Sequence, residues 1–335
     1  MTATPRVGFS ISAGLTPREI VESVVYAESR GYESAWIAEG HGGDQFATLS
    51  ACAVATSSIR LGTCISSVFV RSAPTIAMAA ATVDELSEGR FVLGLGSSHR
   101  VQVGPEHGMV YEKPMKRLAE TTTFIRDLVA HGRASFHGET LAIEQFDLWF
   151  TPHRPRIPIY FAGLFPKMLA LTGQLADGLI LTRTTVDRIA AIRRDVNVGA
   201  ERAGRDPASI EVTSLLVTSV DERPEAAFDA VRPAVAMYAG FFPRYNRLLA
   251  ESGFAQAASD IRRRWEAGDR IGAAAAVPDD MIAATGVIGT PTQCQTRLDS
   301  YRSAGLDLPI INPVVHGEDR LDRVLRAIDA CAPVS

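Results

Sequence analysis

Short apolar runs alternate with longer segments of helical character along almost the whole chain. Runs this short and this apolar are typical of strands buried on both faces of a parallel sheet. They predict eight strands, at residues 7–11, 34–38, 60–66, 91–96, 159–162, 178–182, 210–220 and 308–313. The intervening pattern predicts helices at residues 17–31, 45–56, 74–86, 114–130, 166–176, 187–204, 224–240, 293–304 and 319–330.

Two segments depart from this alternation. Within residues 133–157, the run 136–139 indicates a small hairpin turn, and three prolines mark an irregular approach to the next strand. Residues 241–285 are less regular, and we interpret them as a helical insertion or a mobile lid.

Eight strands that are each followed by a helix fit an α/β fold, the (β/α)8 TIM barrel. We predict a single barrel domain over residues 1–335, with the helical insertion at 241–285. A doubly wound sheet is the alternative, and it usually carries G-x-G-x-x-G directly after its first strand. Here Ser12-Ala13-Gly14 follows that strand, which is not the motif.

Composition narrows the functional classes. The 335 residues carry a net charge of −4, which argues against general nucleic-acid binding. The sequence has neither an apolar run of 18 residues nor a signal peptide, so no membrane partner and a cytoplasmic location are expected. The cysteines are scattered and the histidines lack ligand spacing, which predicts reduced thiols and no metal site.

Residues 87–103 contain the most informative local motif. The apolar run 91–95 ends at Gly96 and is followed at once by three polar residues, Ser97, Ser98 and His99. Glycine at a strand end allows a ligand to approach the backbone, and barrel strands open into their catalytic face at this end. The alternative is a plain strand-to-loop turn with solvated polar side chains.

Five segments together resemble the luciferase-like monooxygenase superfamily. They are Trp36-Ile37-Ala38-Glu39, Asp44-Gln45-Phe46, Leu61-Gly62-Thr63-Cys64-Ile65, the run 79–87 and the run 89–96. The resemblance is greatest to the branch that uses the deazaflavin coenzyme F420, which includes methylenetetrahydromethanopterin reductases. It extends over most of the chain, is weakest at 241–285, and implies a (β/α)8 barrel that is commonly a homodimer.

The resemblance implies a cofactor site around the end of the third strand. The matching pair in similar proteins is a bulge with a cis non-prolyl peptide behind the deazaflavin ring, here Cys64-Ile65. Ile65 would then press on one face of the ring, and Ser66 and Ser67 would donate to ring or ribityl oxygens. The alternative is a plain buried Cys-Ile pair.

The same resemblance indicates three candidate catalytic residues, Glu39, His41 and His99. Similar proteins place an acidic residue beside the cofactor where Glu39 stands, and a histidine acid/base follows it directly in the sugar-phosphate branch, whereas Gly40 intervenes here. His99 occupies the place of that branch's glutamate, with Gln102 near a cofactor-contacting position, which argues against a sugar phosphate. The alternatives are a loop histidine at 41 and a packing or hydrogen-bonding histidine at 99.

Two features are candidates for the anionic tail of the coenzyme. The loop after the fifth strand leads into a helix N-terminus and comprises Ala162, Gly163, Leu164, Phe165, Pro166 and Lys167. Free N–H groups at a helix start bind anions. Arg183, after the sixth strand, is a second candidate for the tail or for a substrate anion. For Lys167 and for Arg183, the alternative is a solvated surface cation.

These features favour an F420-dependent oxidoreductase that moves a hydride between the deazaflavin C5 and a small organic substrate. An FMN-dependent luciferase-like monooxygenase is the first alternative, with FMN as cofactor. A non-catalytic flavin or deazaflavin carrier is the second. Aromatic residues near the irregular segment, Tyr238, Phe241, Phe242, Tyr245 and Trp265, are either the wall of a substrate pocket or ordinary helix packing.

Overall fold

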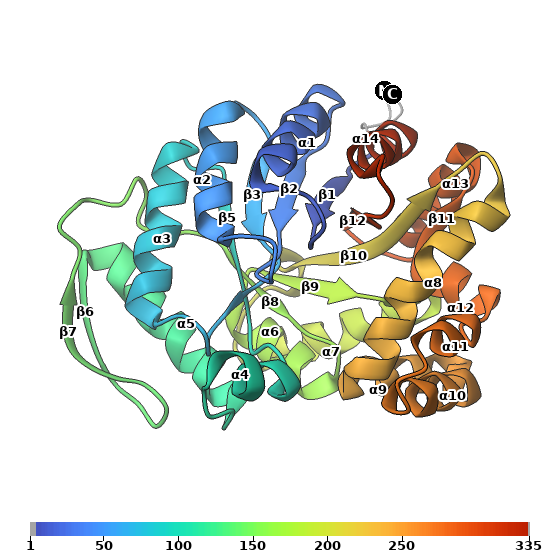
Figure 1. Ribbon diagram of the computed structural model, residues 1–335. Helices are drawn as coiled ribbons and strands as arrows, with labels where there is room; N and C mark the ends of the chain where they lie inside the picture. The colour runs from blue at the N-terminus through green and yellow to red at the C-terminus, as the bar shows by residue number, and fades with distance from the viewer. Residues whose placement is uncertain (1–4, 334–335) are drawn as a thin grey trace.

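The computed structural model describes residues 5–333, and its centre is a closed barrel of eight parallel strands (Figure 1). The strands in chain order are β1 (Gly8–Ile11), β2 (Ser34–Ile37), β3 (Arg60–Thr63), β5 (Phe91–Gly96), β8 (Ile159–Ala162), β9 (Gly178–Thr182), β10 (Glu211–Val220) and β12 (Leu308–Pro313). Pairing of β12 with β1 and of β9 with β10 closes the ring. The predicted (β/α)8 barrel is confirmed.

Helices cover the outside of this barrel. They are α1 (Pro17–Ser29), α2 (Gln45–Ala55), α3 (Ala73–Leu86), α5 (Pro114–His131), α6 (Pro166–Leu175), α7 (Ile189–Arg202), α8 (Pro224–Phe241), α13 (Pro291–Ser303) and α14 (Arg320–Cys331). A capping box begins α1, because Thr16 accepts from the Glu19 N–H and Glu19 accepts from the Thr16 N–H. Short 3-10 turns at Val186–Arg188 and Pro207–Ser209 flank α7.

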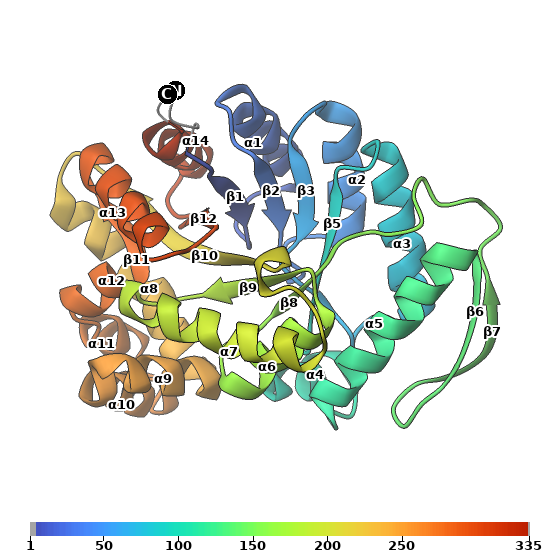
Figure 2. The same cartoon turned by 180° about the vertical axis from the view of Figure 1, so that it is seen from behind.

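An antiparallel hairpin follows α5. Its strands are β6 (Arg133–His137) and β7 (Ala142–Asp147), so the predicted hairpin is present, with its turn at residues 138–141 and not at 136–139. Figures 1 and 2 show that this hairpin projects from the barrel beside α3 and α5. Glu120 on α5 holds the turn, since its carboxylate accepts from the N–H groups of Glu139, Thr140 and Leu141 at 2.8–3.1 Å.

Residues 241–285 are mostly helical. After α8 come α9 (Pro243–Leu249), a π-helical turn (Ala250–Phe254), α10 (Ala255–Glu266), α11 (Arg270–Ala275) and α12 (Asp279–Thr285). They pack on α8 around an apolar cluster of their own that includes Val231, Val235, Ile261 and Met281. They lie on the opposite side of the molecule from the hairpin (Figures 1 and 2).

Three short elements were not predicted. They are β4 (Ser66–Ser67), α4 (Arg100–His107) and β11 (Gly286–Gly289). β11 extends the sheet by pairing with Val217–Val220 of β10, beyond the point where β9 ends. A four-residue run flanked by glycines has no period of its own, and only the free edge of β10 makes it a strand.

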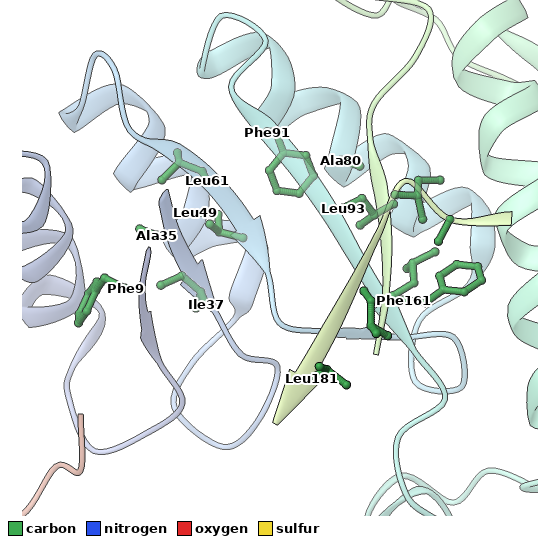
Figure 3. Close-up of a cluster of buried hydrophobic side chains, with 14 of the residues drawn as sticks. Phe9, Ala35, Ile37, Leu49, Leu61, Ala80, Phe91, Leu93, Phe161 and Leu181 are labelled. Carbon is green, nitrogen blue, oxygen red and sulfur yellow. The ribbon is translucent and has the colours of Figure 1, made fainter. Parts of the chain in front are cut away.

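The strands bury both faces. Outward-facing side chains such as Phe9, Ile37 and Leu61 pack against Leu49 of α2 and other helix residues (Figure 3). Inward-facing side chains fill the barrel itself, among them Trp36, Tyr160 and Ile310. The barrel is therefore packed along its length, as in other barrels of this kind.

Charged side chains close the end of the barrel where the strands begin. Arg60 pairs with Glu33 at 2.6 Å and with Glu211 at 3.3 Å, and Arg6 bridges the same two carboxylates. The Tyr160 hydroxyl donates to Glu211 at 2.5 Å. This cluster of charged side chains covers the amino-terminal end of the barrel. Within residues 5–333, no helix is long and apolar enough to span a membrane.

Candidate active site

A cavity of about 790 Å³ opens at the carboxyl ends of the barrel strands. This volume falls in the range of small-molecule sites. The loops after seven barrel strands line it, together with the end of α8 and the start of α9. It contains most of the residues singled out in the sequence, namely Glu39, His41, Cys64, Ile65, Gly96, Ser97, Ser98, His99, Gln102, Ala162, Gly163, Leu164, Phe165 and Arg183.

Three of the candidate residues lie outside the cavity lining. Ser66 and Ser67 are buried behind the floor, where the Ser67 N–H donates to Glu39 at 2.8 Å and the Ser66 hydroxyl does so at 3.4 Å. Lys167 is exposed on the first turn of α6. In this structure the two serines therefore orient Glu39, and Lys167 lies in solvent beside the rim.

The floor of the cavity is a bulge in β3. Gly62 pairs with Val92 and Ser66 pairs with Leu95, so β3 has three residues between the two pairs where β5 has two. One extra residue re-aims the backbone at this point. The bulge contains Cys64 and Ile65, and the peptide bond between them is cis, as the resemblance implies. Both side chains line the cavity and form an apolar floor.

Two glycines of β5 make room for this bulge. A Cβ on Gly94 would lie 1.9 Å from the Thr63 carbonyl oxygen, and a Cβ on Gly96 would lie 2.7 Å from Cγ1 and Cδ1 of Ile65. The hydroxyl of Thr63 also bridges the Gly94 N–H and C=O at 2.8 Å each. The glycine pattern that marked this strand in the sequence thus serves the bulge in the neighbouring strand.

Glu39 is fixed by a network at the end of β2. Its carboxylate accepts from Ser67 and pairs with Arg71, which also pairs with Asp44 at 2.6 Å. Asp44 is at the same time the N-cap of α2 and accepts from the Ala47 N–H. A carboxylate with these partners has a fixed position beside the floor of the cavity.

His41 lies at the rim of the cavity. Its side chain is 76% exposed, and Nε2 is 3.2 Å from a carboxylate oxygen of Glu106 on α4. Since α4 was not predicted, this pairing was not visible in the sequence. The pair lies at the mouth of the cavity, with His41 open to solvent.

His99 is in a different environment from His41. Its ring centre lies 4.6 Å from that of Phe242 and 5.3 Å from that of Tyr245. Burial, followed by the positive charge of Arg244, lowers the pKa of His99 to about 4. At neutral pH the imidazole is therefore uncharged and offers one donor and one acceptor.

We expect the pKa of His99 to be observable directly. In a two-dimensional NMR titration of the imidazole resonances, the signal that is lost in a His99→Gln variant should have its midpoint near pH 4. Burial disfavours the imidazolium, so protonation is delayed to lower pH. A midpoint at the ordinary histidine value, about 6.5, would contradict the buried placement of the ring.

The loop after β8 forms another wall of the cavity. It runs from Ala162 to Phe165, and Phe165 is the N-cap residue of α6. A Cβ on Gly163 would lie 3.1 Å from side-chain atoms of Leu179 and Met168, so this loop packs tightly. The start of α6 adjoins the cavity at this wall, where Pro166 has no N–H and the Met168 N–H donates to the Phe165 carbonyl oxygen at 2.9 Å, so the first turn leaves the Lys167 N–H for a ligand.

Several lining residues were not identified in the sequence, among them Ser12, Met237, Arg244 and Asn312. Ser12 directly follows one predicted strand, and Asn312 is the next-to-last residue of another. The side-chain amide of Asn312 donates to the Ser12 hydroxyl at 2.9 Å. A search of every strand end would have found them. Arg244, whose guanidinium donates to the Tyr111 hydroxyl at 3.0 Å, had no such signal because it comes from α9.

Comparison with known proteins agrees with this architecture. The chain is 28% identical over 284 residues to a 5,10-methylenetetrahydromethanopterin reductase of Methanolobus tindarius, covering 84% of this chain and 85% of the relative. It is 25% identical to a putative coenzyme F420-dependent oxidoreductase of Mycobacterium tuberculosis, with coverages of 88% and 90%.

The fold is also found in a solved structure. The coenzyme F420-dependent tetrahydromethanopterin reductase from Methanopyrus kandleri superposes with a TM-score of 0.86 over 99% of both chains, at 22% identity. The family model for luciferase-like monooxygenases matches residues 1–308, which contain seven of the eight barrel strands and the first residue of the eighth, β12. With its barrel, its bulge at the end of β3 and this match, the chain belongs to the luciferase-like monooxygenase family.

Proposed function

We propose that this protein is an F420-dependent oxidoreductase that transfers a hydride between the deazaflavin C5 and an organic substrate. The observation that carries the proposal is the apolar bulge Cys64-Ile65 at the floor of the cavity, in a chain whose relatives include proteins named as F420-dependent. A flat tricyclic ring needs one apolar wall and a backbone that comes close, and this floor supplies both.

The described residues fit such a cofactor. Gly96 lacks a Cβ where one would collide with Ile65, so the Ile65 side chain keeps its place on the floor. The loop 162–165 and the start of α6 would hold the anionic tail through backbone N–H groups. The cavity of about 790 Å³ has room for a planar cofactor with a substrate beside it.

When bound, F420 supplies a hydride donor or acceptor at C5, and the chain supplies position and proton control. Ile65 would cover one face of the ring and leave the other face to the substrate. Glu39, held by Arg71 and Ser67, fixes a negative charge beside the floor. Neutral His99 orients a polar group by hydrogen bonding, while His41 with Glu106 moves a proton between the cavity and solvent.

The experiment that tests this proposal is a fluorescence titration of the purified protein with F420 and, in parallel, with FMN, each oxidised and reduced. We expect F420 to bind at least about a hundredfold more tightly than FMN, which amounts to roughly 3 kcal/mol. Tighter binding of FMN than of F420 would make the protein a flavin monooxygenase and would be followed by an oxygen-consumption assay. Binding of neither would remove the cofactor assignment while leaving the barrel unchanged.

A further inference from the structure

Arg183 is a buried cation at the edge of the cavity. It follows β9 directly, and its φ of +53° is in the left-handed region that residues other than glycine rarely adopt. The residue is 5% exposed and lines the cavity. Within residues 5–333, neither Nε nor Nη1 of its guanidinium has a hydrogen-bond partner. The side chains that act on its charge are Tyr238 and Tyr245, with no carboxylate among them.

An arrangement of this kind is costly without an acceptor. An arginine remains protonated in proteins, and a buried charge requires pairing and hydrogen bonding. The guanidinium carbon lies 3.9 Å from the centre of the Tyr238 ring. That contact attracts the cation to the ring face and still leaves Nε and Nη1 without an acceptor. The cavity therefore contains donors that a ligand with oxygen acceptors would satisfy.

The surroundings of Arg183 are aromatic and carry further positive charge. The Tyr238 ring centre lies 5.0 Å from that of Tyr245 and 5.3 Å from that of Phe242. Arg244 lines the same part of the cavity. Across the cavity, Glu39 is paired with Arg71 and Glu106 lies against His41, so neither carboxylate neutralises the positive charge of Arg183 and Arg244.

We propose that the substrate of this enzyme is an organic anion with an apolar or aromatic body, whose acidic group is bound by Arg183. This inference rests on the proposed function, since it assigns the substrate end of the same cavity. The acidic group is a carboxylate or a phosphate, because either presents two oxygens to the guanidinium fork. The rings of Tyr238, Phe242 and Tyr245 would pack on the body of the substrate.

Geometry separates this position from the tail of the cofactor. The backbone donors suited to the tail are on the loop 162–165 and the start of α6, after β8. Arg183 follows the next strand and packs on residues of α8 and α9. A ligand group at Arg183 is thus enclosed by side chains of α8 and α9. Neither helix contributes to the floor of the cavity.

The test uses small anions as probes on the full-length protein saturated with F420. Benzoate, 2-naphthoate and phenyl phosphate are titrated by calorimetry, with benzamide as the uncharged counterpart of benzoate. We expect the anions to bind wild-type protein and to lose about thirtyfold or more in affinity in Arg183→Gln, whereas benzamide binding is weak and equal in both. Arg183→Lys keeps the charge without the fork and should recover part of the loss.

The control variant is Arg188→Gln, on the same connection between β9 and α7. The Arg188 guanidinium donates to the Ser252 hydroxyl at 3.2 Å and does not line the cavity, so anion binding should be unchanged. Circular dichroism and thermal melting of both variants establish that the barrel is intact before any titration is interpreted.

A second comparison separates substrate from cofactor tail. F420 and a ribityl deazaflavin that lacks the anionic tail are titrated into wild type and Arg183→Gln. We expect less than a twofold change for either compound. A loss specific to F420 would place the tail at Arg183 and overturn the proposal, as would the failure of every anion to bind wild type or equal binding of benzoate and benzamide. Failure of the proposed function is seen separately, as the absence of F420 binding to wild-type protein.

Discussion

Gly94→Ala is expected to prevent folding or to lower the free energy of unfolding by at least about 4 kcal/mol, a large fraction of the stability of a typical domain. The added Cβ would lie 1.9 Å from the Thr63 carbonyl oxygen and 2.9 Å from Cδ1 of Ile180. The first of these atoms belongs to the backbone of the bulge and has nowhere to move, because the Thr63 hydroxyl is itself bonded to both backbone groups of Gly94. To relieve this collision, β3 would have to separate from β5.

Chemical denaturation with a matched glycine variant measures this effect. Gly104→Ala is the control, since its Cβ would meet nothing closer than the Met109 carbonyl oxygen at 3.9 Å and its position in α4 favours alanine. The control should be as stable as wild type or slightly more so. A Gly94→Ala protein that is soluble and within about 1 kcal/mol of wild type would show that the bulge does not press on β5 as described.

Gly96→Ala should fold and yet bind the proposed cofactor at least about tenfold more weakly, a loss of roughly 1.4 kcal/mol. Here the added Cβ would lie 2.7 Å from Cγ1 and Cδ1 of Ile65, the mobile end of a side chain. Ile65 can rotate away, at a cost in stability of about 1–3 kcal/mol. It would then leave its place on the floor and enter the space that a ring requires.

A double-mutant cycle tests this explanation. Ile65→Ala removes the atoms that collide with the new Cβ, so the double variant should bind F420 better than the sum of the two single losses predicts. The measurement is the same fluorescence titration, with Gly104→Ala again as control. Strict additivity of the two losses would mean that Gly96 and Ile65 act on the cofactor through separate contacts.

Local pattern was sufficient for most of the fold. The short apolar runs placed every barrel strand, because strands buried on both faces cannot tolerate polar interruptions. The capping box of α1 is equally local, since it is formed by residues only three apart. By contrast β11 and α4 were missed, because each is short and depends on a neighbour: β11 on the free edge of β10, and α4 on packing over the cavity.

The candidate site divides in the same way. Positions at strand ends, such as Glu39, Gly96 and Arg183, were identifiable because barrel topology brings all strand ends to one face. The burial and the contacts of each side chain were not identifiable from the sequence. Both His41 and His99 were acid/base candidates, yet one is exposed beside Glu106 and the other is buried against Phe242 with a pKa near 4.

The sequence by itself determined the barrel, the order of its strands, and the loops that contribute to the site, because periodicity and strand ends are local properties of the chain. Only the tertiary structure decided the chemistry of those positions. The charge on His99, the lack of an acceptor within residues 5–333 for Nε and Nη1 of Arg183, and the collision that keeps residue 94 a glycine all depend on atoms far away in sequence. Burial and close approach are properties of neighbours in space, and a one-dimensional pattern does not encode them.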